Sequence, residues 1–265
     1  TQSATARLSM SFSSISSIIR QDLKTKMRKP SSSTKRLWGW LISLALLIVV
    51  GVLGYQLYQT SQTPPPAPAP THQSEPGSNL AIDQLTKLPV KDAETGDDYQ
   101  RSNFSHGWAS WRSCNVRQKI LNRDVKDIKL APNGCTVVSG NLLDPYTGRQ
   151  IELSTKEAVS KKVQIDHVVA LGNAWRTGAR YLSATERKEL ANDDLELIAV
   201  SSAANQEKSD SDADQWLPSN VAFHCAYVAR QIAVKLKYRL WVTPAESSAM
   251  KRVLTGCPTE PLPAK

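Results

Sequence analysis

The chain has 265 residues, of which 33 are Lys or Arg and 24 are Asp or Glu, so its net charge is +9. Eight of the basic residues and a single acid, Asp22, lie in residues 1–36, and the rest of the chain is close to neutral. The high pI therefore reflects one short segment, which excludes overall basicity as an argument for binding nucleic acid.

Residues 37–58, LWGWLISLALLIVVGVLGYQLY, carry no charge. About 20 apolar residues suffice to cross a bilayer as a helix, so the segment predicts a transmembrane anchor. The basic residues 1–36 then predict a cytoplasmic tail, with the bulk of the chain outside the cell. A cleaved signal peptide is the alternative, although its apolar region would normally be shorter.

Residues 59–79 are rich in proline and predict a largely extended linker. Residues 80–265 follow as an exterior domain that is long enough to bury a core without a partner. All four cysteines, Cys114, Cys135, Cys225 and Cys257, lie in it. An even count in an exported domain predicts two disulfides, and proximity along the chain favours Cys114–Cys135 and Cys225–Cys257. Metal ligation is the weaker alternative, because the sequence has no C-x-x-C pair.

Hydrophobic periodicity predicts a mixed α+β domain. The expected strands are two within residues 135–153, joined by a turn at 144–148, then one in 162–171 and one in 195–200. The expected helices lie in residues 111–125, 173–182, 183–194, 201–217, 220–240 and 243–254. Two of these starts carry capping-box spacing, Ser183 with Glu186 and Thr243 with Glu246.

Asp166 and His167 stand together at the end of a predicted strand, between apolar residues. Titratable groups in such surroundings need partners, so one interpretation is a structural hydrogen-bonded pair. The other is catalytic, because a neutral imidazole can take a proton from water and a carboxylate can hold a hard cation. The pair is expected where the strand ends, with the ring facing solvent and substrate.

The order of strand, strand and helix, with DH on the first strand and NQEKSD on the helix, resembles the HNH or ββα-metal nucleases. Five segments resemble exported actinobacterial HNH proteins related to the C-terminal domain of the GmrSD restriction endonucleases: DPYTGR, IDHVVALGNAW, LANDDLELIAV, NQEKSDSDADQWLP and FHCAYVARQIAVK. The resemblance covers residues 99–257. It implies an α+β fold with an HNH core, a β-hairpin plus a helix, elaborated with additional helices.

The resemblance also implies a site. His167 would activate water, and Asp166 and Asn205 would hold Mg²⁺ or Mn²⁺ against the scissile phosphate. Lys208 and Arg117 are the candidates for contacts with phosphate. The alternative for Lys208 is an ordinary surface lysine, and the alternative for Arg117 is an ion pair with an acid inside the domain. The implied partners are nucleic acid, with DNA favoured, and the membrane; no protein partner can be inferred.

One position departs from the pattern of the resemblance. Where relatives carry an Asn that ties the hairpin together, this chain has Glu196, which cannot donate a hydrogen bond while ionised. The hairpin-tying role is therefore in question at this position. A separate competing hypothesis is a catalytically inactive surface module that binds nucleic acid or envelope polymer. A metal hydrolase acting on peptides or peptidoglycan is disfavoured, because the chain has no H-E-x-x-H motif.

Overall fold

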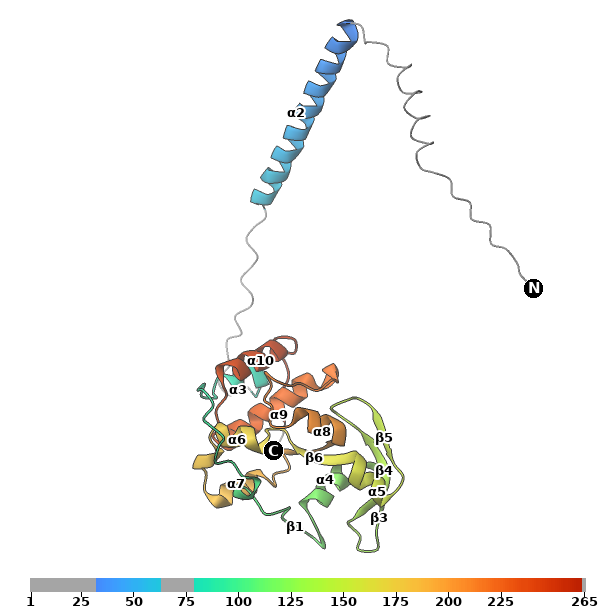
Figure 1. The fold of residues 1–265 in the computed structure, drawn as a ribbon, viewed down its shortest axis with the longest axis vertical. Coiled ribbons are helices and arrows are strands. Elements are labelled where there is room, and N and C mark those ends of the chain that lie inside the picture. Colours follow the sequence, from blue (N-terminus) through green and yellow to red (C-terminus); the bar gives the residue numbers. More distant parts are fainter. Residues whose placement is uncertain (1–31, 63–78, 264–265) are drawn as a thin grey trace, which may run out of the picture. The chain divides into compact units, whose positions relative to one another are not determined.

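The computed structural model describes residues 32–62 and 79–263 (Figure 1). The chain divides into two units, Thr1–His72 and Gln73–Lys265, and each is described by itself. In the first, helix α2 (Ser32–Gln62) contains the apolar segment. Over the described residues, no helix combines the length and the apolar character that a bilayer crossing requires, so the anchor predicted at 37–58 is not supported. Most of the predicted cytoplasmic tail (1–36) and linker (59–79) lies outside the described residues.

The second unit is a mixed α+β domain with three small antiparallel sheets among its described residues. The strands are β1 (Ser110–Trp111), β2 (Cys114–Asn115), β3 (Lys126–Leu130), β4 (Val137–Leu143), β5 (Gln150–Leu153), β6 (Val163–His167) and β7 (Leu197–Ser201). The helices are α3 (Ala81–Leu85), α4 (Val116–Asp124), α5 (Lys156–Lys162), α6 (Leu171–Arg176), α7 (Ala184–Leu190), α8 (Ser202–Lys208), α9 (His224–Lys237) and α10 (Pro244–Thr255). Short 3₁₀ turns lie at Arg101–Asn103, Ala179–Tyr181 and Val221–Phe223.

Local sequence signals account for several of the element starts. The predicted capping boxes are present at Ser183 before α7 and at Thr243 before α10. The turn between β4 and β5 is closed by Gly148 in the left-handed region (φ +69°), which glycine adopts without steric cost. Asp144 holds this turn together by accepting from Tyr146 N (3.2 Å) and Thr147 Oγ1 (2.6 Å). Five elements were not predicted: α3, α5 and the strands β1, β2 and β3. The helix expected over residues 111–125 begins only at Val116, because β1 and β2 occupy residues 110–115.

The hairpin of β6 and β7 pairs Asp166 with Ile198 and His167 with Leu197, and α8 follows β7 directly. This is the predicted ββα order, with residues 168–196 inserted between the two strands. Alternate residues of a strand point to opposite faces. One face of the hairpin therefore packs with α4 and β4 in one hydrophobic core, and the other packs with α9 and its neighbours in a second core.

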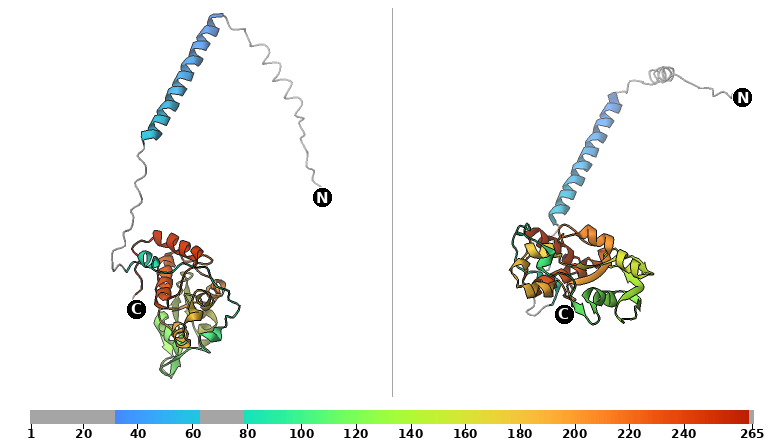
Figure 2. Two further views of the ribbon diagram at one scale, coloured as in Figure 1. Left: turned by 90° about the vertical axis from the view of Figure 1, so that its left-hand side faces the viewer. Right: turned by 60° about the horizontal axis from the view of Figure 1, so that its bottom comes forward.

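The two cores occupy different sides of the domain. In Figure 1, α3, α9 and α10 gather at one side and the sheet of β3, β4 and β5 at another, with β6 between them. The turned views of Figure 2 keep the red C-terminal helices and the yellow-green sheet apart. The hairpin that carries the Asp-His pair is thus supported on both faces, which fixes the pair at the end of β6.

Candidate active site

Asp166 is 5% exposed, and both of its oxygens have partners. The Tyr146 hydroxyl, presented by the β4–β5 turn, donates to Oδ2, and the Lys208 ammonium lies 3.1 Å from Oδ1. Burial raises the pKa of the Asp166 carboxyl, and the charge of Lys208 opposes that shift. A carboxylate offers about four acceptor positions, so two remain for a further ligand.

His167 is also only 5% exposed, so the expectation that its ring faces solvent is wrong. Its ring stacks on Trp108, with centroids 5.7 Å apart and planes 6° apart. Its Nε2 atom lies 3.0 Å from the carbonyl oxygen of Ala191. A carbonyl only accepts hydrogen bonds, so Nε2 carries the proton and Nδ1 keeps its lone pair. Burial lowers the pKa of His167 to about 3, and the ring is neutral at ordinary pH.

Asn205 lies on α8, and its Nδ2 donates to Gln164 Oε1 on β6 at 2.7 Å. Asn205, Asp166 and His167 line one open cleft of about 380 Å³. The structure therefore brings the three predicted residues together around a single cavity. Among the hydrogen bonds of the described residues, none uses Asn205 Oδ1, which is the atom that a hard cation would prefer.

Lys208 is fully buried and does not lie where the predicted phosphate contact would need it. Its ammonium donates to Asp166 and, at 2.8 Å, to the carbonyl oxygen of His167. Both acceptors belong to the Asp-His pair, so Lys208 fixes the end of β6 from within. The interpretation of Lys208 as a surface phosphate ligand is accordingly replaced by a positioning role.

Arg117 occupies a cavity of about 310 Å³ beside the first cleft, where Asn205 and Gln164 form part of both walls. Its Nη2 donates to the carbonyl oxygens of Val159 (3.3 Å) and Val163 (3.1 Å). Burial lowers the pKa of the guanidinium without neutralising it. Arg117 is thus half-buried, oriented by the backbone and close to the catalytic candidates.

Glu196 ties the hairpin together, although an ionised glutamate cannot donate the hydrogen bond that an Asn could. Its side chain is fully buried, and Oε2 accepts from Val169 N at 3.2 Å, while its backbone oxygen accepts from Val168 N at 2.9 Å. Gln231 Nε2 donates to the Val168 carbonyl at 2.9 Å. The tie needs only an acceptor from residue 196, so the inability of an ionised carboxylate to donate is no obstacle. Burial also raises the pKa of Glu196 well above its ordinary value.

Four contributors to the site were not predicted as such. Gln164 and Tyr146 position Asn205 and Asp166, Trp108 stacks on His167, and Arg101 lines the cleft. The segment DPYTGR had marked the turn that presents Tyr146, and an alternation of faces along β6 could have placed Gln164 beside Asp166. Nothing in the local sequence around Arg101 or Trp108 indicates a site.

Both predicted disulfides are confirmed, Cys114–Cys135 and Cys225–Cys257. The first joins β2 to the segment before β4, and the second joins the start of α9 to the segment just after α10. Metal ligation by these cysteines is therefore excluded. Elsewhere, too, within the described ranges, no group of three or more His, Cys, Asp or Glu side chains is placed to hold an ion.

The donor set nevertheless fits one kind of cation. Mg²⁺ and Mn²⁺ take oxygen ligands, and Mg²⁺ keeps several waters, so one carboxylate and one amide oxygen are enough protein ligands. Asp166 has acceptor positions left, and Asn205 Oδ1 has no hydrogen bond among the described residues. The charge of Lys208, which lies 3.1 Å from Asp166, opposes any cation at this position, so an ion would bind here only weakly.

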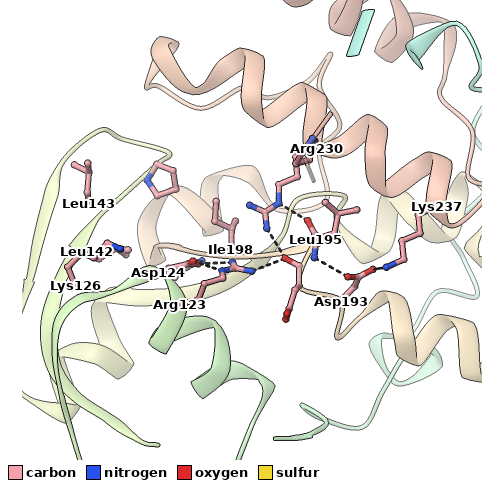
Figure 3. Close-up of a pocket in the computed structure, with 14 residues that line it drawn as sticks. Arg123, Asp124, Lys126, Leu142, Leu143, Asp193, Leu195, Ile198, Arg230 and Lys237 are labelled. Carbon is pink, nitrogen blue, oxygen red and sulfur yellow. Dashed lines mark hydrogen bonds and ion pairs between the residues drawn. The ribbon is translucent and has the colours of Figure 1, made fainter. Parts of the chain in front are cut away.

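A larger cavity, of about 660 Å³, lies over β7 and is lined by Arg123 and Arg230 (Figure 3). Arg123 forms the internal pair with Asp124 that its neighbour had suggested, at 2.6 Å. Arg230 donates to the carbonyl oxygens of Asp194 and Leu195. These arginines hold the turn that enters β7, and their donors are occupied in doing so.

A β-hairpin followed by a helix, with Asp and His ending the first strand and Asn on the helix, defines the domain as a ββα arrangement around one polar cleft. Residues 115–253 match the family described as GmrSD restriction endonucleases, C-terminal domain, and the chain belongs to that family. Family membership makes the domain one of nuclease type. The match begins after Arg101 and Trp108, which are therefore outside it.

A curated relative, described as an uncharacterized secreted protein of Arthroderma benhamiae, is 37% identical over 194 residues. The alignment covers 72% of this chain and 92% of the relative. Because that relative is fungal, the narrower likeness to exported actinobacterial proteins is not supported. No solved structure matches the chain significantly.

Proposed function

We propose that the domain is a metal-dependent HNH-type endonuclease that hydrolyses phosphodiester bonds of nucleic acid, with DNA as its substrate. The observation that carries this proposal is the state of His167. Its Nε2 proton is committed to Ala191, and the residue lines the same cleft as Asp166 and Asn205. A neutral imidazole with a free Nδ1 is what a general base requires.

In this mechanism, His167 Nδ1 takes a proton from the water that attacks phosphorus. The Nε2–H group goes on donating to the Ala191 carbonyl oxygen, and this hydrogen bond stabilises the imidazolium that forms. The negative charge of a bound phosphate raises the pKa of the ring from its low resting value, since an opposite charge favours the protonated form. Trp108 limits rotation of the ring by stacking on it.

Asp166 and Asn205 would hold Mg²⁺ or Mn²⁺, which supplies positive charge to the phosphate and to the departing oxygen. Lys208 and Tyr146 keep the Asp166 carboxylate in one orientation. Arg117, from the adjoining cavity, would contact the phosphate backbone of the substrate.

The test is cleavage of supercoiled plasmid by the purified chain with Mg²⁺, Mn²⁺ or EDTA. His167→Gln keeps an amide donor for the Ala191 carbonyl but has no base, so we expect a rate loss of about 10²–10⁴ with little change in stability. Cleavage that persists in EDTA, or in His167→Gln, would refute the mechanism.

One observation favours the competing function, an inactive module that binds nucleic acid. Asp166 already has an ion pair and a hydroxyl partner, and His167 is nearly buried, so the site is stable without a cation. Under this alternative, the plasmid binds but is not cut with any metal. Gel-shift and nicking assays on one preparation separate the two functions.

We further propose an extracellular location. The two disulfides and the description of the fungal relative as secreted support it, because disulfides persist in oxidising compartments. The proposal does not depend on a membrane anchor. It is tested by fractionating cells and probing for the protein in the medium and at the cell surface.

A further inference from the structure

The segment between α3 and β1 forms a wall of the candidate active site. Arg101, at the 3₁₀ turn, lines three neighbouring cavities: the catalytic cleft, the cavity of Arg117, and a small one of about 100 Å³ against the His167 ring. Trp108 lines the last two. Residues 101–108 therefore overlie the point where these cavities meet.

The Arg101 side chain is exposed, and within the described part of the chain its guanidinium makes no side-chain hydrogen bond or ion pair. Other arginines of the domain are occupied: Arg176 with Asp210 at 2.6 Å, and Arg123 with Asp124. An exposed guanidinium without an acidic partner, at the edge of a cleft, is available to an anion.

The charge changes from the catalytic cleft to the adjoining cavity. The catalytic cleft holds two acids, Asp166 and Asp210, and each is paired with a cation of the domain. The adjoining cavity has Arg101 and Arg117 among its lining residues and no acid. A polyanion that places one phosphate at Asp166 therefore finds a favourable position for the next phosphate in the adjoining cavity.

We infer that Arg101 and Arg117 form a subsite for the phosphate next to the scissile one, so that the substrate strand runs from the Asp166 cleft into the Arg117 cavity. The inference rests on the proposed nuclease function. It adds Arg101, which lies outside the residues that match the family, 115–253. It identifies the substrate class as a chain with at least two consecutive phosphodiesters.

Kinetics on the full chain test the inference, with a 12-base-pair DNA duplex as substrate. Loss of an interaction made equally in ground and transition states raises KM and leaves kcat unchanged. We expect Arg101→Gln to raise KM about tenfold, the usual size of one charged hydrogen bond. The slope of log affinity against log salt should also fall by about one. Arg101→Lys, which keeps the charge, should restore most of the affinity.

Lys251→Gln is the control, because Lys251 is an exposed cation on α10 that lines none of the three cavities. It removes the same charge and should change neither KM nor the salt slope. If the wild-type chain cleaves and Arg101→Gln leaves KM and the salt slope unchanged, the subsite is refuted and the nuclease function stands. A fall in kcat without a change in salt slope also overturns it, by indicating a positioning role. A wild-type chain that cleaves nothing overturns the nuclease function and the subsite with it.

Discussion

Among the described residues of the domain, two lysines are completely buried, and each is paired with a buried carboxylate. Lys208 contacts Asp166, and Lys235 contacts Glu246 at 2.8 Å. Each also donates to a backbone carbonyl, of His167 and of Trp241 respectively. By burial and pairing alone, the two regions are alike.

They differ in what surrounds the carboxylate. Asp166 lines an open cleft and adjoins a neutral imidazole, whereas Glu246 lies at the start of α10, accepts in its capping box and joins α9 to α10. Burial raises the pKa of both acids, and the paired lysine opposes the shift in both. A buried ion pair is therefore not itself evidence of a catalytic site; access from a cleft together with a base makes the difference.

The largest contrast is expected in activity. Asp166→Asn removes the anionic ligand while keeping the shape of the side chain, and we expect the cleavage rate to fall on the order of 10³-fold, the loss typical of a deleted electrostatic contact in the transition state. Glu246→Gln, the matched change in the scaffold pair, should leave the rate per folded molecule unchanged. Single-turnover cleavage measures both. Equal losses would contradict the distinction between the two pairs.

The next contrast is in stability. Lys235→Met leaves Glu246 buried without its cation, and we expect it to lower the free energy of unfolding by about 3–5 kcal/mol. Lys208→Met should cost less, because Asp166 keeps the Tyr146 hydroxyl and lies beside the cleft. Urea denaturation checks both values. The double change Lys235→Met, Glu246→Leu should recover most of the loss; if it does not, the pair is not the source of the cost.

A smaller contrast is expected with pH. The pKa of His167 is about 3 in the fold and about 6.5 when unfolded, so the unfolded chain binds the proton more tightly between those values. Stability from this group is complete above pH 6.5 and is lost as the pH falls toward 3. Between pH 7 and pH 5 the loss is about 2 kcal/mol. His167→Gln should lack this component when the two proteins are compared by urea denaturation at both pH values.

The smallest effects are expected at the helix caps. Ser183→Ala removes the N-cap of α7 and should cost about 1 kcal/mol. Ala191, the C-cap of the same helix, accepts from the His167 ring. Thr243→Ala on α10 should cost a similar amount. Thermal melts measure both. A far greater loss for Ser183→Ala would mean that α7 is marginal without its cap.

Short-range signals in the sequence predicted much of the fold. The capping boxes, the turn at 144–148 and both strands of the hairpin were found because each depends on residues close in the chain. Strand β3 was missed because its KDIKL sequence is largely exposed and has little apolar character. Helix α5 was missed for the same reason, with only Val159 buried.

The site was predicted only as far as motifs reach. Asp166, His167 and Asn205 line one cleft, but the buried position of Lys208 depends on contacts that no motif shows. Tyr146, Trp108 and Arg101 reach the site from segments distant in sequence, and only the tertiary fold determines such neighbours. The buried state of His167 likewise depends on Trp108 and Ala191.

The insertion between β6 and β7 carries both Ala191, which sets the imidazole tautomer, and Glu196, which closes the hairpin. A minimal hairpin and helix cut out of this domain would keep every residue of the sequence motif but would lose the carbonyl that fixes the tautomer of His167. Shortening or regrafting residues 168–196 is accordingly a change to the reacting machinery, and libraries that vary this stretch should hold its last six positions constant.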